Sequence, residues 1–264
     1  MNAPPPLIAP RTPLVPVAPN LRHAFGGIWR LTLRRFLLPS RWLTLLIGLA
    51  VLALLAFAAS RTGGGSDNYA GWVGNFFVTF LVPALAFVVA AGAMRDEMKS
   101  GTVDYVLTRP VPRPAFVVFK FVAHTLCEQI DFVIALVVVL AIGTARGVPD
   151  LGAAWPKLLL GQVLLVTAAS AFGFLAGILT SRYVVIGIAY AGVIEVGLGQ
   201  IPTQLSRLSL TRQIRDLLEP AAGAAGSVAA AFGTVGLILI FTSAALAAAA
   251  ALFNLRELGA PNES

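Results

Sequence analysis

The chain has 264 residues, of which 58% are hydrophobic and 12% are charged. A soluble domain carries about 25% charged residues, and this composition in water would expose large apolar patches, so a water-soluble fold is excluded. The formal net charge of +7 does not indicate a nucleic-acid binder, because the basic residues lie beside hydrophobic runs instead of forming a separate basic stripe. The sequence predicts a single all-α integral membrane domain.

The first 39 residues precede the apolar runs. Residues 1–20 are rich in proline, which removes backbone donors, and are predicted to be a disordered tail. Residues 21–39 place apolar side chains on one helical face and arginines elsewhere, a pattern typical of an amphipathic helix at the membrane interface. We expect Pro39 to end this helix and Ser40 to cap the span that follows.

Six apolar runs in residues 40–256 are long enough to cross a bilayer, which takes about 20 residues. They cover residues 42–59, 72–94, 117–142, 158–180, 183–199 and 226–253. Thirteen Lys and Arg residues flank these runs on the side of the termini and six flank them on the other side. Cytoplasmic loops carry the excess of basic residues, so both termini are predicted to be cytoplasmic, with residues 257–264 as a tail. The loop after the fifth run is predicted to hold a short amphipathic helix on the outer surface.

The loop between the second and third runs is charged and contains three prolines. We expect Asp96 and Glu97 in the first turn of a short helix, where the helix dipole favours carboxylates. Gly101 permits a sharp change of direction, and the prolines from Pro110 onward fix an extended exit into the third run. The pattern predicts a rigid, bent cytoplasmic loop that can transmit movement to the membrane helices.

An ordered set of residues in this loop resembles the loop of type-2 ATP-binding-cassette (ABC) transporter permeases. The set is Glu97, Gly101, Thr102, Pro110, Arg113 and Lys120. Val103 and Pro112 stand where the family most often has Leu and Ser. The resemblance implies a six-helix permease whose first cytoplasmic loop forms a coupling helix in a groove of a separate ATPase subunit. The residues expected to make that contact are Asp96, Glu97, Lys99, Gly101, Thr102, Arg109, Pro110 and Arg113.

The resemblance also implies partners and a location. The permease would form a homodimer or a heterodimer in the bacterial inner membrane, surrounded by membrane lipids, and would act as an exporter. The sequence contains no G-x-x-x-x-G-K-[ST] motif, so we expect no ATPase activity and no catalytic residue in this chain. ATP and Mg would bind to the partner ATPase, and this chain is expected to bind no cofactor of its own.

Ionisable residues inside the apolar runs are candidates for a pathway, because charges in lipid are costly. Lys120, His124, Glu128 and Asp131 follow helical spacing and share one face of the third run. This face can line a vestibule, relay protons, or be a self-compensating surface packed on another helix. Holding a metal is a further reading of this face, since His and carboxylates are plausible ligands, but a single histidine is thin evidence and no metal site is predicted. Glu195 in the fifth run is either a pathway residue or a group bonded to a neighbouring helix.

Small residues and a proline mark packing and hinge positions. Pro83 lies within the second run, where it removes one backbone hydrogen bond and is a candidate hinge. Gly173 and Gly177 form a G-x-x-x-G pair that allows close helix approach, most simply within the protomer.

Two other classes of function remain open at the level of sequence. An ion- or proton-coupled carrier, or a membrane-embedded enzyme, would use the polar face of the third run and need no ATPase. A scaffold for other membrane proteins would transport nothing.

Overall fold

The computed structural model describes residues 21–61, 66–98, 111–149, 151–191, 195, 209–218 and 228–255. Every regular element within these ranges is helical, which confirms the predicted all-α class for the described part of the chain. The elements are α1 Leu21–Phe36, α2 Pro39–Ala59, α3 Ser66–Trp72, the π-helix η1 Val73–Leu81, α4 Val82–Glu97, α6 Arg113–Ala145, α7 Leu151–Leu179, α8 Tyr183–Tyr190, α9 Leu210–Leu218 and α10 Val228–Leu255.

Five helices within the described ranges are long and apolar enough to cross a membrane, so the chain is a multi-pass membrane protein. They are Pro39–Ala59, Asn68–Glu97, Arg113–Ala145, Leu151–Leu179 and Phe232–Leu255. These helices correspond to the first four predicted spans and the sixth. Of the predicted fifth span, the structure describes α8, Ala191 and Glu195. Residues 192–194 and 196–208 lie outside the described residues. The fifth crossing therefore stays a prediction.

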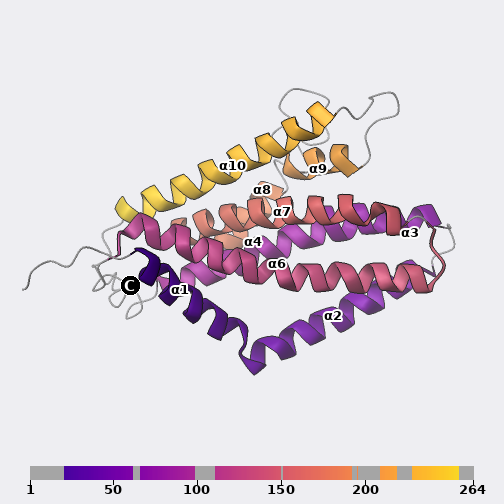
Figure 1. Ribbon diagram of the computed structural model, residues 1–264, viewed down its shortest axis with the longest axis horizontal. Helices are drawn as coiled ribbons and strands as arrows, with labels where there is room; N and C mark the ends of the chain where they lie inside the picture. The colour runs from indigo at the N-terminus through magenta and orange to yellow at the C-terminus, as the bar shows by residue number, and fades with distance from the viewer. Residues whose placement is uncertain are drawn as a thin grey trace, which may run out of the picture.

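The helices α1 and α2 meet at a sharp turn that projects from the bundle (Figure 1). The interfacial helix ends at Phe36, three residues earlier than predicted, and Pro39 begins α2 instead of ending α1. The expectation that Ser40 caps α2 is wrong: Leu38 occupies the N-cap position, and no side chain caps it. A proline at the first helical position has the required φ and no N–H to satisfy, so Ser40 lies inside the first turn.

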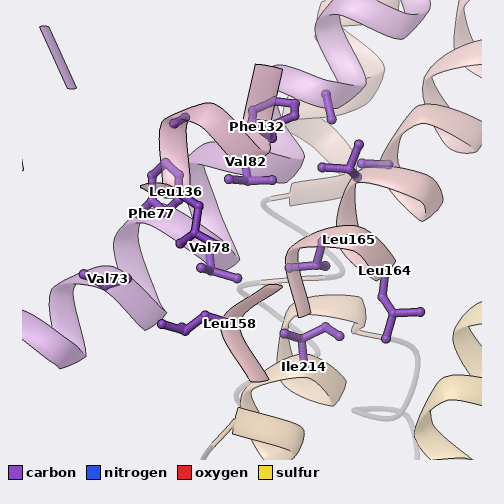
Figure 2. Close-up of a cluster of buried hydrophobic side chains, with 14 of the residues drawn as sticks. Val73, Phe77, Val78, Val82, Phe132, Leu136, Leu158, Leu164, Leu165 and Ile214 are labelled. Carbon is purple, nitrogen blue, oxygen red and sulfur yellow. The ribbon is translucent and has the colours of Figure 1, made fainter. Parts of the chain in front are cut away.

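The helix α7 is the centre of the bundle, and α2 is at its edge. Two thirds of the membrane span of α7 (67%) is buried inside the chain, against 11% for α2. The exposed face of α2 carries large apolar side chains such as Leu43, Leu46 and Leu54, which suits contact with lipid. Figure 2 shows the core side chains that α7 shares with η1, α4, α6 and α9.

The helices α4 and α7 approach each other closely at the G-x-x-x-G pair. A methyl group added to Gly173 would lie 2.6 Å from the backbone oxygen of Phe87, and one added to Gly177 would lie 2.5 Å from that of Ala91. Distances of this kind are found only when a glycine allows backbone to pack against backbone. Gly173 and Gly177 thus lie against the backbone of α4 within the protomer.

The second span widens into a π-helix directly before Pro83. The N–H of Val82 donates to the carbonyl of Phe77, five residues back, instead of the usual four. In an α-helix a proline ring clashes with the carbonyl four residues earlier, and wider turns at this point give the ring space. Pro83 was predicted to be a candidate hinge; the structure places it at the boundary between η1 and α4.

The helix α9 confirms the predicted short helix after the fifth span. Leu210 and Ile214 are buried, and a Cβ on Gly161 of α7 would lie 3.1 Å from a methyl group of Ile214. The helix therefore packs into the bundle beside α7 and η1. It lies toward the opposite end of the molecule from the C-terminal end of α10 (Figure 1).

Candidate functional site

The carboxylate of Glu97 lies at the end of the second span, where the predicted coupling loop begins. Glu97 is the last residue of α4, and its Oε1 accepts hydrogen bonds from Arg35 Nη1 at 2.7 Å and Lys120 Nζ at 2.9 Å. The side chains of Glu97 and Lys120 are buried, whereas that of Arg35 is 56% exposed. The two ion pairs join α4 to α1 and α6 at the point where the loop begins.

The predicted position of Asp96 and Glu97 in the first turn of a short helix is wrong. Both residues lie in the last turn of α4, the negative pole of its dipole, where a carboxylate is unfavourable without compensation. For Glu97 that compensation is the pair of cations. Five other residues of the predicted contact set lie outside the described residues. They are Lys99, Gly101, Thr102, Arg109 and Pro110.

The far end of the loop is tied to the last membrane helix. Arg113 is the first residue of α6, and its Nη1 donates to the backbone oxygen of Asn254, near the end of α10, at 3.4 Å. Both ends of the 98–112 connection are therefore held to other helices, on the side of the molecule where α10 ends.

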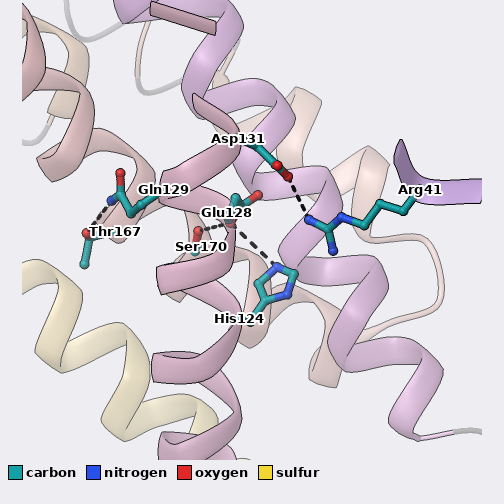
Figure 3. A network of polar contacts seen from close by, with 7 residues as sticks. All are labelled: Arg41, His124, Glu128, Gln129, Asp131, Thr167 and Ser170. Atoms are coloured by element: carbon teal, nitrogen blue, oxygen red, sulfur yellow. Dashed lines mark hydrogen bonds and ion pairs between the residues drawn. The ribbon is translucent and has the colours of Figure 1, made fainter. Parts of the chain in front are cut away.

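Three of the four polar residues on this face of the third span are bonded to other helices. Lys120 pairs with Glu97 of α4, as described. Glu128 Oε2 accepts a hydrogen bond from Ser170 Oγ of α7 at 2.8 Å, and Asp131 Oδ2 accepts one from Arg41 Nη2 of α2 at 2.8 Å. Figure 3 shows the contacts of Glu128 and Asp131.

Two atoms of this polar face have no hydrogen-bond partner among the described residues. His124 Nε2 and Glu128 Oε1 are both fully enclosed, and His124 Nε2 lies 3.6 Å from the other oxygen of Glu128, beyond hydrogen-bond length. Within the described ranges no three His, Cys, Asp or Glu side chains gather in a way that would hold a metal ion. His124 and Glu128 are groups that can hold a proton, whereas Lys120 and Asp131 form ion pairs with other helices.

Glu195 binds the start of α9. Its two carboxylate oxygens accept hydrogen bonds from the hydroxyls of Tyr190, Ser209 and Thr211 at 2.7, 2.6 and 2.5 Å. The backbone N–H groups of Leu210 and Thr211 donate to it as well, each at 3.1 Å. The carboxylate thus satisfies the free donors at the N-terminus of α9 and lies at the positive end of its dipole. It holds this helix to the segment after α8.

A cavity of about 390 Å³ lies beside Glu195. Its walls come from η1, α4, α7, α8 and α9, and most of the side chains are apolar. They are Asn75, Thr79, Phe80, Pro83, Ala84, Phe87, Val88, Leu165, Ala169, Phe172, Val184, Gly187, Ile188, Tyr190, Ala191, Glu195, Leu210, Thr211 and Arg215. Two of the predicted residues, Pro83 and Glu195, are brought together here, whereas Lys120, His124, Glu128 and Asp131 do not line this cavity.

Sequence reasoning missed the partners of the predicted residues. Arg35 and Arg41 were assigned only to the basic flank of the first span, and Ser170 carried no signal in an apolar run. Arg215 was counted only among the six basic residues on the other side of the predicted spans, and not as a residue of a cavity. The i, i+4 spacing of Thr211 and Arg215 on a helix with an apolar face is the one pattern that could have pointed to it.

Comparison with known protein families identifies the family of the chain. The model of a family described as ABC-2 family transporter protein matches residues 34–195, more than half of the chain. The matched range contains the first four spans, the whole 98–112 connection and the polar face of α6. No curated protein matches the chain.

Proposed function

The chain belongs to the ABC-2 transporter family, and we propose that it is driven by a separate ATPase subunit that contacts the 98–112 connection. Membership of the family makes the chain a permease subunit of an ABC transporter, and membership generally entails association with an ABC ATPase. The observation that carries the proposal is that the family match runs through the entire connection in which the coupling residues were predicted.

The ion pairs of Glu97 support a mechanical role for this connection. A force applied to a loop moves membrane helices only if the ends of the loop are fixed to them. At one end Glu97 joins α4 to α1 and α6, and at the other Arg113 joins α6 to α10. Closure of the ATPase dimer around ATP would then displace four helices together instead of bending one loop.

The remaining parts of the proposal concern location and stoichiometry. Both termini and the 98–112 connection face the cytoplasm of a bacterium, and the permease forms a dimer, either with itself or with a related chain, in the inner membrane. ATP and Mg bind to the ATPase subunits, and the complex exports its substrate. Basic residues on α1 and at the ends of α4 and α6 support this orientation.

A cross-linking experiment tests the proposed contact. Cys127 is buried, and its replacement by Ser gives a background without cysteine. Lys99→Cys and Arg109→Cys should cross-link to the partner ATPase subunit in inside-out vesicles. Arg146→Cys, at the other end of α6, is the matched control and should not react with it. Cross-linking from Arg146→Cys, or from none of the three, would contradict the proposal.

A further inference from the structure

The cavity beside Glu195 has a size and lining suited to a small, mainly apolar ligand. Its volume of about 390 Å³ is near the lower end of the range for ligand pockets, roughly 300–1,000 Å³. The floor is formed by Leu165, Ala169 and Phe172 of α7, with Phe87 of α4 beside them. A ligand of this volume has room for one hydrocarbon chain and a small head group.

The cavity opens sideways onto the face of the protein that contacts lipid. Phe80 and Ile188 line it and are 60% and 68% exposed, and Val88 and Val184 at the same rim are also exposed. Phe80 and Val88 belong to the second membrane span, so their exposed surface contacts hydrocarbon and not water. Val184 and Ile188 belong to α8, which is part of the predicted fifth span. A ligand can therefore enter from the membrane with its chain first.

The end of the cavity at α9 is polar and carries the positive charge of Arg215. Thr211 and Arg215 are one turn apart on α9, and both line the cavity. The acceptor oxygens of Glu195 are already occupied by five donors. Arg215 makes no ion pair or hydrogen bond within the described ranges, and its guanidinium offers donors that match a carboxylate or a phosphate.

We propose that this cavity binds an anionic amphiphile with a single hydrocarbon chain, and that this is the class of substrate of the transporter. The chain lies between Phe80, Phe87 and Ile188, and the anionic head group lies against Arg215. The assignment as a substrate rests on the proposed function, whereas the binding itself does not require the ATPase.

The test is photolabelling of the permease alone in nanodiscs of a zwitterionic lipid. The probes are palmitic acid carrying a diazirine near the end of its chain and the corresponding uncharged alcohol. The acid should label peptides of η1, α4 and α8 in a saturable manner, and the alcohol should label them much less. Labelling that does not saturate, or that is as strong on the lipid-facing side of α2, would overturn the proposal.

Two pairs of variants locate the site. Ala84→Trp fills the cavity, while Leu85→Trp places the same side chain on the neighbouring exposed position outside it. Arg215→Gln removes the charge, while Arg215→Lys keeps it. Ala84→Trp should abolish saturable labelling, and Arg215→Gln should weaken binding of the acid about tenfold, as expected for the loss of a charged hydrogen bond. Arg215 is exposed, so its replacement by Gln should leave the fold intact. Unchanged labelling of Arg215→Gln would therefore refute the head-group assignment, whether or not Ala84→Trp folds.

A second measurement separates a substrate from a resident membrane lipid. In liposomes that contain the permease and its ATPase subunit, palmitic acid should raise the rate of ATP hydrolysis over the concentration range in which it labels the cavity. Labelling without stimulation would overturn the substrate assignment. Failure of labelling would leave association with the ATPase untouched, so it would not be confused with failure of the proposed function.

Discussion

Glu97 shows how one side chain can join three helices at the start of a loop. Its ion pair with Lys120 is buried, and its ion pair with Arg35 is partly open to solvent. A buried charge that loses its partner is strongly unfavourable, whereas a partly exposed pair contributes little. The two contacts should therefore differ in their effect on stability although they share one oxygen.

The first prediction follows from this difference. Glu97→Gln leaves the Lys120 ammonium buried without a counter-charge and should lower the free energy of unfolding by on the order of 3 kcal/mol. Arg35→Ala should lower it by less than about 1 kcal/mol. Thermal unfolding of the purified variants in detergent measures both effects. The double variant Glu97→Leu/Lys120→Met should recover most of the loss, and equal effects of the two single variants would contradict this account.

The second prediction concerns Glu195 and the start of α9. Glu195→Gln replaces one acceptor oxygen by an NH₂ group that faces existing donors, and charged hydrogen bonds of this type contribute about 1.5–3 kcal/mol. We expect α9 to detach from the bundle more readily, which hydrogen exchange of residues 209–218 would report as faster exchange. Ser209→Ala removes a single donor and should have a smaller effect. Unchanged exchange in Glu195→Gln would show that the carboxylate does not hold α9.

The residues of the polar face could be predicted from the sequence, but their partners could not. The spacing from Lys120 to Asp131 places these side chains on one face of any α-helix. Which groups they meet depends on how helices separated by tens of residues pack, as with Arg41 and Asp131. For the same reason the position of Glu195 in an apolar run indicated a special residue without indicating its role at α9.

Among the elements, α4 and α7 form the tightest pair of helices in the described part of the chain. The two glycines of α7 lie against the backbone of α4, so even a methyl group has no space. By contrast, a methyl group on Gly48 of α2 would meet nothing within 4 Å. The same substitution should therefore have opposite consequences on the two helices.

The third prediction uses this contrast. Gly173→Ala and Gly177→Ala should each lower the free energy of unfolding by about 2 kcal/mol, because overpacking forces the two backbones apart. Gly48→Ala should cause no loss, since alanine has a higher helix propensity than glycine. The midpoints of thermal unfolding provide the comparison. A loss for Gly48→Ala as large as for Gly173→Ala would indicate a general intolerance of the membrane helices to substitution.

Element positions were predicted well from the length of the apolar runs, and element ends were not. The third span was expected at residues 117–142, and α6 extends over Arg113–Ala145 because a helix continues through polar residues once its backbone bonds are made. The α-to-π transition before Pro83 could not be predicted, since a proline indicates only that the regular pattern must change. The loop containing Asp96 and Glu97 was misplaced for a related reason: α4 runs on past the apolar segment.

On the scale of the whole molecule, the orientation in the membrane and the fifth crossing are open to a direct test. Basic residues favour cytoplasmic termini, and the residue before α8 and the helix α9 would lie on opposite sides of the fifth crossing. Arg182 precedes α8 and Asp216 is in α9, and both are exposed.

The fourth prediction places these two residues on opposite sides of the bilayer. In the Cys127→Ser background, a membrane-impermeant maleimide added to intact cells should label Asp216→Cys and not Arg182→Cys. Permeabilised cells should show labelling of both. Labelling of both in intact cells, or of neither, would contradict the six-span arrangement with cytoplasmic termini.

We propose that a separate ATPase drives this permease through the 98–112 connection. The most direct measurement is ATP hydrolysis by the permease and its co-purified ATPase subunit in liposomes, with residues 99–110 either native or replaced by a Gly-Ser linker of equal length. The account predicts that the native chain co-purifies with the subunit and supports hydrolysis. The linker variant should insert into the membrane with an unchanged unfolding midpoint and lose both properties. Co-purification and hydrolysis that survive the replacement would contradict it.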